Sequence, residues 1–154
     1  MDTSGKYIKM CEKAEEIQGG WETQIGDYVV IRYRRVAGII VREERDNNYE
    51  VFVSGNSCLT DTYHIEELFP LWSQERLMKI AGISIHNKVR DLLDLISFAL
   101  SPYPPTYQVS PVSRNAEDIF DTFEQLLLAY AMLKRYKKVW NDEKECWEVN
   151  DERD

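Results

Sequence analysis

Apolar and polar positions alternate most clearly between residues 28 and 53. The alternating runs are Val29–Tyr33, Ile39–Val41 and Tyr49–Val53. Successive side chains of a strand point to opposite faces of a sheet, so this period of two predicts three strands. Gly38 and the cluster Asp46–Asn48 are expected to form the two reversals, because these residue types are favourable in tight turns. The pattern therefore predicts a short antiparallel meander.

Apolar residues at spacings of three and four predict helices before and after this meander. The expected helices cover about Ser4–Gln18, Gln74–Ala81, His86–Leu100 and Asn115–Lys138. The apolar stripe of the third is Val89, Leu92, Leu93, Ile96 and Leu100. The stripe of the fourth is Ile119, Phe123, Leu126, Leu127, Tyr130 and Leu133. We expect these stripes to be the packed faces of their helices.

The order of elements predicts an α+β fold, in which the meander packs with about four helices. Gly26-Asp27 before the first strand and a turn near Ile65 and Leu68 after the last are also compatible with an SH3-like barrel. We expect one compact unit over 1–154. It comprises a β sub-region at 26–72, a helical sub-region at 73–140 and an acidic tail at 141–154, where Trp140 and Trp147 can face each other in a short hairpin.

Composition narrows the setting in which the protein works. The chain has 154 residues, a net charge of −8 and three widely spaced cysteines. The negative charge disfavours nucleic acid and anionic lipid as partners. The cysteine spacing suggests neither a disulfide framework nor a zinc ribbon, which fits a reducing cytoplasm. No apolar run resembles a signal peptide or a membrane span, so we expect no membrane association.

The sequence gives little evidence for a catalytic or metal site. Cys58 and His64 lie near carboxylates, and a thiolate enzyme needs a cysteine beside an oriented base. Spacing alone does not orient them, and a loop histidine with a packed thiol is the favoured interpretation. A catalytic zinc usually has three protein ligands, and the second histidine of the chain lies 22 positions after His64, so a zinc site on His64, Glu66 and Glu67 is disfavoured. We therefore expect no catalytic residue, no metal and no cofactor.

The more interesting pattern is a group of arginines in the meander. Alternation along paired strands is expected to bring Arg32, Arg34 and Arg42 to one sheet face. With Tyr28 and Phe52 nearby, this face could contact phosphate and stack bases, or bind an acidic protein segment. Intervening acids could instead pair with the arginines and leave a solvated, salt-bridged surface. These acids are Glu43, Glu44 and Glu50.

A second candidate surface is the proline-rich connector 101–111. Prolines lack an amide donor and cannot continue a helix, so the connector is predicted to be extended. Tyr103 and Tyr107 on such a segment suit recognition by a partner.

Several short segments resemble one group of proteins. They are Cys11–Gln18, Leu71–Leu77 and Phe123–Asn141, together with Trp21, Gly26-Asp27 and Trp147. These patterns resemble small, uncharacterised proteins encoded by phages and prophages of Firmicutes. The resemblance implies a phage or prophage origin and the cytoplasm of a bacterial host. It implies no activity and no site residues, and residues 82–114 and the arginine-bearing strands do not share it.

Three functional hypotheses follow. The leading one is a non-enzymatic adaptor or accessory protein that binds a host or phage protein. The alternative is a nucleic-acid-associated accessory protein that uses the basic sheet face. The third, an enzyme built on Cys58 and His64, is the weakest. The sequence leaves the oligomeric state open.

Overall fold

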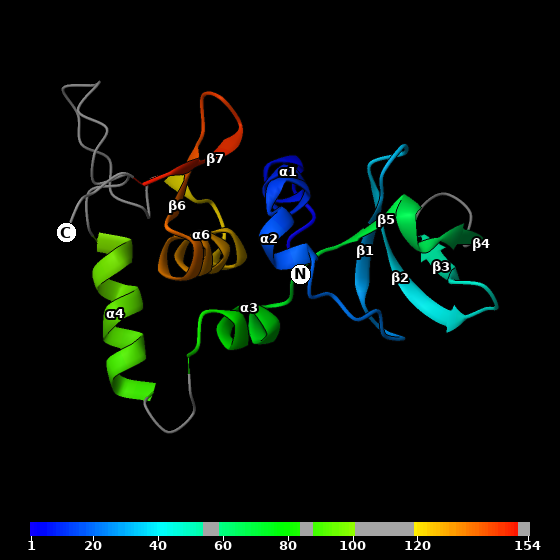
Figure 1. Cartoon of the computed structure of the whole chain (residues 1–154), viewed down its shortest axis with the longest axis horizontal. Coiled ribbons are helices and arrows are strands. Elements are labelled where there is room, and N and C mark those ends of the chain that lie inside the picture. The colour runs from blue at the N-terminus through cyan, green and yellow to red at the C-terminus, as the bar shows by residue number, and fades with distance from the viewer. Residues whose placement is uncertain (54–58, 84–87, 101–118, 151–154) are drawn as a thin grey trace. The chain divides into compact units, whose positions relative to one another are not determined.

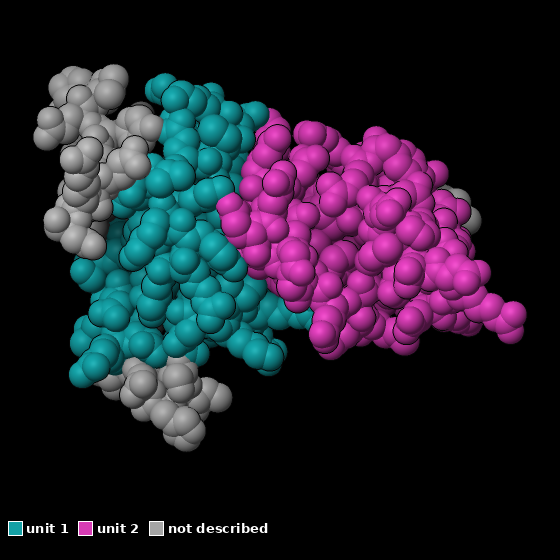
Figure 2. Space-filling view, viewed as in Figure 1, with its two compact units in different colours: residues 1–2, 73–154 teal, residues 3–72 magenta. Residues whose placement is uncertain are grey.

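The computed structural model describes residues 1–53, 59–83, 88–100 and 119–150. Over these ranges the protein is α+β, with a five-stranded antiparallel sheet, a two-stranded hairpin and five α-helices (Figure 1). The predicted fold class is confirmed. The chain divides into two compact units (Figure 2). Unit 2 is Thr3–Trp72, and unit 1 is Ser73–Asp154 together with Met1–Asp2.

Five short strands build the sheet of unit 2. In chain order they are β1 (Tyr28–Ile31), β2 (Val36–Glu43), β3 (Asn48–Val53), β4 (Leu59–His64) and β5 (Leu68–Pro70). All pairs are antiparallel, and the order across the sheet is β4-β3-β2-β1-β5. The predicted meander is confirmed, and β5 forms where the sequence predicted only a turn.

The strand order also shows whether the sheet closes into a barrel. β4 and β5 lie at opposite edges of the sheet, so the described strands form no closed barrel. A single 3₁₀ turn, η1 (Ile65–Glu67), leads from β4 into β5. β5 then returns to pair with β1 along its whole length of three residues.

The first reversal lies at residues 32–35 and not at Gly38, so that prediction was wrong. Gly38 lies inside β2 and pairs with both neighbouring strands. A Cβ atom there would lie 2.5 Å from Val51 Cγ1 and 2.9 Å from the carbonyl oxygen of Phe52. The glycine therefore permits close approach of β3 and does not form a turn.

The second reversal, between β2 and β3, agrees with the sequence. Asp46 and Asn47 both adopt positive φ, at 59° and 58°. Asn and Asp tolerate this region better than most residues. The side-chain amide of Asn48 also donates to the carbonyl of Arg45 at 2.9 Å, which closes the turn.

The two faces of the sheet differ. The inner face carries the core of unit 2, which is Val29, Ile31, Ile40, Tyr49, Val51, Tyr63 and Leu68. Trp21 packs against this core, and its indole N–H donates to Asp27 at 3.1 Å. The opposite, outer face carries Val30 and Phe69, which are register partners and are also buried.

Two short helices precede the sheet, where the sequence predicted one. The helix α1 (Gly5–Lys13) begins after Ser4, whose hydroxyl oxygen accepts from the amide of Tyr7 at 3.2 Å. Ala14, with ψ of 58°, interrupts the helix before α2 (Glu15–Gln18). The hydroxyl of Tyr7 donates to the carbonyl of Trp72, so the first helix is tied to the end of unit 2.

Unit 1 contains three described helices, α3 (Gln74–Ile80), α4 (Lys88–Leu100) and α6 (Phe123–Tyr136). The last was predicted to begin near Asn115, and residues 115–118 lie outside the described ranges. The structure starts α6 after Thr122, whose hydroxyl oxygen accepts from the amide of Gln125 at 3.3 Å. The buried part of the helix includes Leu127, Leu128, Ala129, Tyr130, Ala131 and Met132.

A polar contact anchors the start of α6. The carboxylate of Asp2 accepts from Thr122 Oγ1 at 2.7 Å and from Gln125 Nε2 at 2.9 Å. Gln125 is fully buried, and buried amides need such partners. This contact explains why Asp2 belongs to unit 1 although Thr3 begins unit 2.

The predicted stripe of α4 is not its packed face. Leu93, Ile96 and Leu100 are 59%, 43% and 57% exposed, whereas Leu95 is buried. Phe98 on the packed side contacts the ring of Tyr130 on α6, with ring centroids 5.4 Å apart. The prediction was wrong because α4 carries apolar residues on two sides, and periodicity alone does not say which side finds a neighbour. The side chains of Val89 and Leu92 lie outside the description.

The hairpin predicted near the end of the chain is confirmed. It consists of β6 (Lys138–Asn141) and β7 (Cys146–Val149), and Trp140 lies opposite Trp147. Their rings meet edge to face with centroids 5.1 Å apart, a favourable aromatic geometry. Within the described ranges, no helix has both the length and the apolar character that spanning a membrane requires.

Candidate functional site

The three candidate arginines do not share one sheet face. β1 ends at Ile31, so Arg32 and Arg34 lie in the β1–β2 turn. Arg32 lies over the ring of Phe69, which belongs to the outer face. Arg34 lies over Tyr63, which belongs to the inner core. The expectation of one shared face assumed regular alternation, which ends where the turn begins.

Arg34 is the centre of a compact group that we call the turn cluster, formed by Tyr33, Arg34, Asp61 and Tyr63. Its guanidinium lies 5.6 Å from the ring centroid of Tyr33 and 5.8 Å from that of Tyr63. A guanidinium N–H donates to Asp61 Oδ2 at 3.1 Å, and the hydroxyl of Tyr63 donates to the same oxygen at 3.2 Å. These contacts hold Arg34 between two aromatic rings and a carboxylate.

The members of the turn cluster differ in exposure. Tyr63 is 3% exposed, whereas Tyr33 is 62% exposed. The two rings lie 6.3 Å apart, so Tyr33 rests on a buried partner while much of its surface faces solvent. The cluster therefore exposes the ring of Tyr33, whose position is held by its contacts with Tyr63 and Arg34.

The same contacts shift the pKa values of two groups. Burial, followed by the hydrogen bond to Asp61 and the charge of Asp61, raises the pKa of Tyr63 from 10.0 to about 12. Interaction with Tyr63 and the hydrogen bond to Asp61 raise the pKa of Arg34, which therefore stays charged.

These shifts predict an alkaline limit to the stability of unit 2. Unfolded Tyr63 ionises near its ordinary pKa of 10.0, but folded Tyr63 stays protonated until about pH 12. A raised pKa gives stability that is complete below pH 10.0 and is lost as pH rises toward about 12. Urea unfolding of the wild type and of Tyr63→Phe checks this, because only the wild type should lose this contribution over that interval. Equal losses in both proteins would contradict the assignment.

The remaining candidate residues form a separate row on the outer face. Tyr28 and Phe52 are both register partners of Ile39, so they flank it on one face. Tyr28 is 38% exposed. Arg42 lies in register with Glu50, two residues from Phe52, and therefore continues this face. The structure thus places Tyr28, Phe52 and Arg42 on one face of the sheet, and Arg34 lies away from that face.

Most of the arginines already have acidic partners. Arg42 lies 3.6 Å from Glu44 and 3.5 Å from Glu50, and Arg35 pairs with Glu12 at 3.2 Å. Such exposed pairs contribute little to stability, yet they neutralise part of the local positive charge. The salt-bridged surface that the sequence left open as an alternative is therefore formed in part.

Comparison with known proteins gives no information about the function of the chain. No family model, curated protein or solved structure matches the chain. The argument about function therefore has to rest on the geometry of these side chains.

The other candidate residues divide into structural and undescribed ones. His64 precedes η1, where its Nδ1 accepts from the amide of Glu66 at 3.4 Å and its own amide donates to Glu67 at 2.9 Å. This is a helix cap, which gives His64 a structural role. Cys58, Tyr103 and Tyr107 lie outside the described residues. Within the described ranges, no three metal-ligating side chains gather at one point.

Sequence reasoning missed Tyr33, Asp61 and Tyr63 as site residues. Tyr33 was assigned to a strand, and Asp61 was counted only among the carboxylates near Cys58 and His64. The contact between Arg34 and Asp61 spans 27 positions, so no local pattern reveals it. A weak signal was available, since Tyr33 stands among Arg32, Arg34 and Arg35, and tyrosine and arginine are enriched among the residues that dominate binding at protein interfaces.

Proposed function

We propose that the chain is a non-enzymatic interaction protein that docks another protein through the turn cluster of unit 2. The exposed ring of Tyr33 carries this proposal. Tyrosine and arginine are the residue types most enriched where protein interfaces concentrate their binding energy. A ring that is already ordered by Arg34 and Tyr63 loses little conformational entropy on binding.

The charge around the cluster favours a protein partner over a phosphate backbone. Arg34 is paired with Asp61, and Arg35 is paired with Glu12. The positive charge is therefore partly balanced within unit 2. A protein segment with an apolar residue for Tyr33 and one or two acids for the surrounding arginines fits this surface. Following the resemblance to phage-encoded proteins, we propose a host or phage protein as the partner.

The test is affinity capture from bacterial lysate with three versions of the whole chain. They are the wild type, Tyr33→Ser and the matched control Ile25→Ser, which removes another exposed apolar side chain of unit 2 (67% exposed). We expect a protein that the wild type and Ile25→Ser retain and that Tyr33→Ser loses. With that protein purified, Tyr33→Ser should weaken the Kd roughly 10-fold or more. If Tyr33→Ser retained every captured protein, the turn cluster would not be the docking site.

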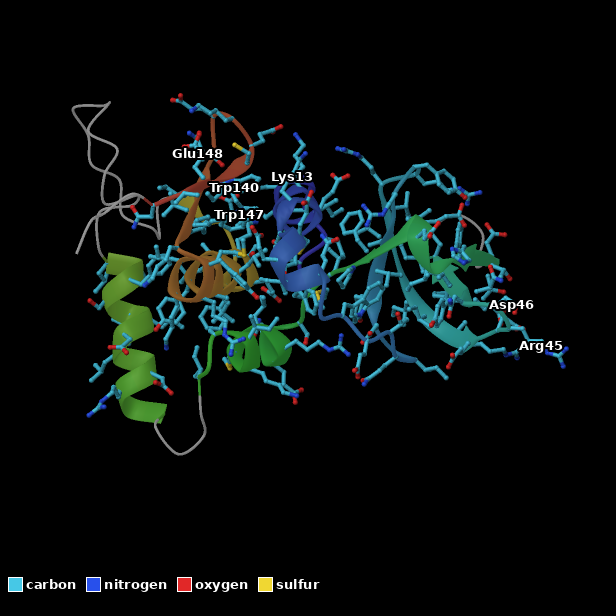
Figure 3. All side chains as sticks on the ribbon, in the orientation of Figure 1. Lys13, Arg45, Asp46, Trp140, Trp147 and Glu148 are labelled. Atoms are coloured by element: carbon cyan, nitrogen blue, oxygen red, sulfur yellow. The ribbon has the colours of Figure 1, made fainter. Side chains whose placement is uncertain are left out.

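A second function is supported by the outer-face row. Tyr28 and Phe52 share a face with Arg42, an arrangement that can stack bases and contact a phosphate. Labelled DNA and RNA titrated at low and physiological salt test it, with Arg42→Glu as the variant. The matched control is Arg45→Glu, because Figure 3 shows Arg45 beside Asp46 at the tip of the β2–β3 turn, directed away from the sheet. Salt-sensitive binding that only Arg42→Glu loses would support nucleic-acid binding as the function. Absence of binding at low salt would rule that function out.

A further inference from the structure

The turn cluster lies at an edge of the sheet of unit 2. Two of its members, Asp61 and Tyr63, belong to β4, which is the last strand in the order β4-β3-β2-β1-β5. Among the described strands only β3 pairs with β4, and it does so along all six residues of β4 (Figure 1). The other side of β4 therefore presents backbone N–H and C=O groups that no described strand uses. Such groups are a template for a further strand.

The register of β4 with β3 shows which residues direct these groups outward. The amide of Ile65 donates to the carbonyl of Asn47 at 2.9 Å, so this pair is hydrogen-bonded. Hydrogen-bonded and non-hydrogen-bonded pairs alternate along an antiparallel ladder. The pairing continues without a shift through β4, so every second residue before Ile65, that is Tyr63 and Asp61, bonds to β3. The residues between them point their backbone groups away from β3.

These outward residues are Thr60, Thr62 and His64. The amide of His64 donates to the carboxylate of Glu67 at 2.9 Å, outside the ladder, which agrees with the outward direction. The same bond occupies one end of the edge, so the available stretch is at Thr60 and Thr62. Both threonines are exposed, and β4 contains neither lysine nor proline, the residues that commonly block an edge strand.

We propose that the protein partner of unit 2 docks as an extended segment that pairs with β4 at Thr60 and Thr62. This inference rests on the proposed docking role of the turn cluster and specifies the form of the partner. Pairing along the edge satisfies the outward backbone groups of both threonines, as in other complexes that add a strand to a sheet. An added strand lies about 4.8 Å from its neighbour, so it passes directly beside the turn cluster.

The side chains beside this edge define the composition of the segment. Every second residue of the segment lies on the face of Asp61 and Tyr63, which are in contact with Arg34 and Tyr33. The residue opposite Asp61 should be apolar, because an acid there would meet a like charge and an apolar side chain can contact Tyr33. An acid two positions away can approach Arg34, whose side chain is 49% exposed. The intervening residues lie beside the exposed threonines and can be polar.

A second copy of β4 fits this edge less well than a partner segment does. In a two-fold antiparallel pair that uses all the outward groups, Thr60 of one copy bonds to Thr62 of the other. Asp61 then lies directly opposite Asp61 of the other copy, and like charges in this position are destabilising. Asp61 therefore disfavours pairing between two copies and leaves the edge to a different chain.

Thr62→Pro tests the pairing directly. It removes an amide that faces away from β3, so the β3–β4 ladder is kept, and proline is tolerated at such edge positions. Thr62→Val is the matched control, because it keeps the amide and the β-branched shape. The probe is a blocked seven-residue peptide, Thr-Asp-Thr-Leu-Thr-Asp-Thr, titrated into the whole chain. Wild type and Thr62→Val should bind it, and Thr62→Pro should bind it roughly 10-fold more weakly or worse, because it loses a hydrogen bond and gains a clash.

Amide exchange of the wild type gives a second measurement that needs no variant. The amides of Thr60 and Thr62 have no acceptor among the described residues, so they should exchange fast in the free chain. The bound peptide should slow both. A peptide that slows neither amide at millimolar concentration would overturn the inference. Equal affinity of Thr62→Pro and Thr62→Val, both folded by circular dichroism, would also overturn it, and if Thr62→Pro does not fold, the exchange result decides alone.

Capture from lysate separates this inference from the proposed function. A protein that Tyr33→Ser loses and Thr62→Pro retains would keep the turn cluster as the docking site and refute strand pairing. A protein that Thr62→Pro loses and Tyr33→Ser retains would keep the pairing and refute the turn cluster. Sedimentation equilibrium tests the other occupant: a mass of two chains that Thr62→Pro reduces to one would assign the edge to a second copy and overturn the partner segment.

Discussion

Replacing Gly38 with alanine is expected to destabilise unit 2 by about 1–3 kcal/mol, the usual range for overpacking a filled site. The new Cβ would lie 2.5 Å from Val51 Cγ1, and it would also lie 2.9 Å from the carbonyl oxygen of Phe52. Val51 can rotate or shift, but the carbonyl is backbone and is held in the β2–β3 ladder. Urea unfolding, with amide exchange to locate the loss in the sheet, measures the effect.

The matched control is Gly20→Ala. A Cβ at Gly20 meets no atom within 4 Å, so this change should alter the free energy of unfolding by less than about 0.5 kcal/mol. If Gly38→Ala proved as harmless as Gly20→Ala, the close approach of β3 to β2 would be wrong, and with it the register of the central strands.

Leu127→Ala is expected to destabilise unit 1 by about 2–5 kcal/mol. Leu127 is fully buried on α6, the helix that contacts both α3 and α4. Removing its side chain takes apolar contacts from the centre of unit 1 and leaves a cavity. Urea unfolding, with amide exchange to locate the loss in unit 1, measures the effect, because Trp21 and Trp72 of unit 2 would also contribute to a fluorescence signal.

The same chemical change at an exposed site provides the comparison. Leu93→Ala removes the same leucine side chain at a position that is 59% exposed. It should change the free energy of unfolding by less than about 0.5 kcal/mol. Similar effects of the two truncations would mean that α6 is not the centre of the core of unit 1.

Local signals in the sequence were enough to locate most elements of this fold. The period of two placed the strands between residues 28 and 53. The helix predicted from Gln74 begins there as α3, where the hydroxyl oxygen of Ser73 accepts from the amide of Arg76. Asp46 and Asn47 indicated the β2–β3 turn for the same reason that they adopt positive φ in the structure. Each of these signals involves only a few neighbouring residues, so it can be recognised in the sequence without the structure.

The errors concern contacts between distant residues. Gly38 was taken as a turn because the approach of Val51 cannot be read from the local sequence. The packed side of α4 depends on Tyr130, which lies 32 positions after Phe98. The turn cluster depends on β4 meeting the β1–β2 turn. In each case the local pattern allowed two outcomes, and tertiary packing chose one.

The bond between Asp2 and Thr122 has a consequence for biosynthesis. It spans 120 positions, so Asp2 leaves the ribosome long before its partner is made. At roughly 5–20 residues per second, that wait is on the order of ten seconds. Thr3–Trp72 can complete its own sheet during this interval, since every strand pair of unit 2 lies within it. Asp2 therefore makes its contact at the start of α6 only after the sheet of unit 2 has had time to form.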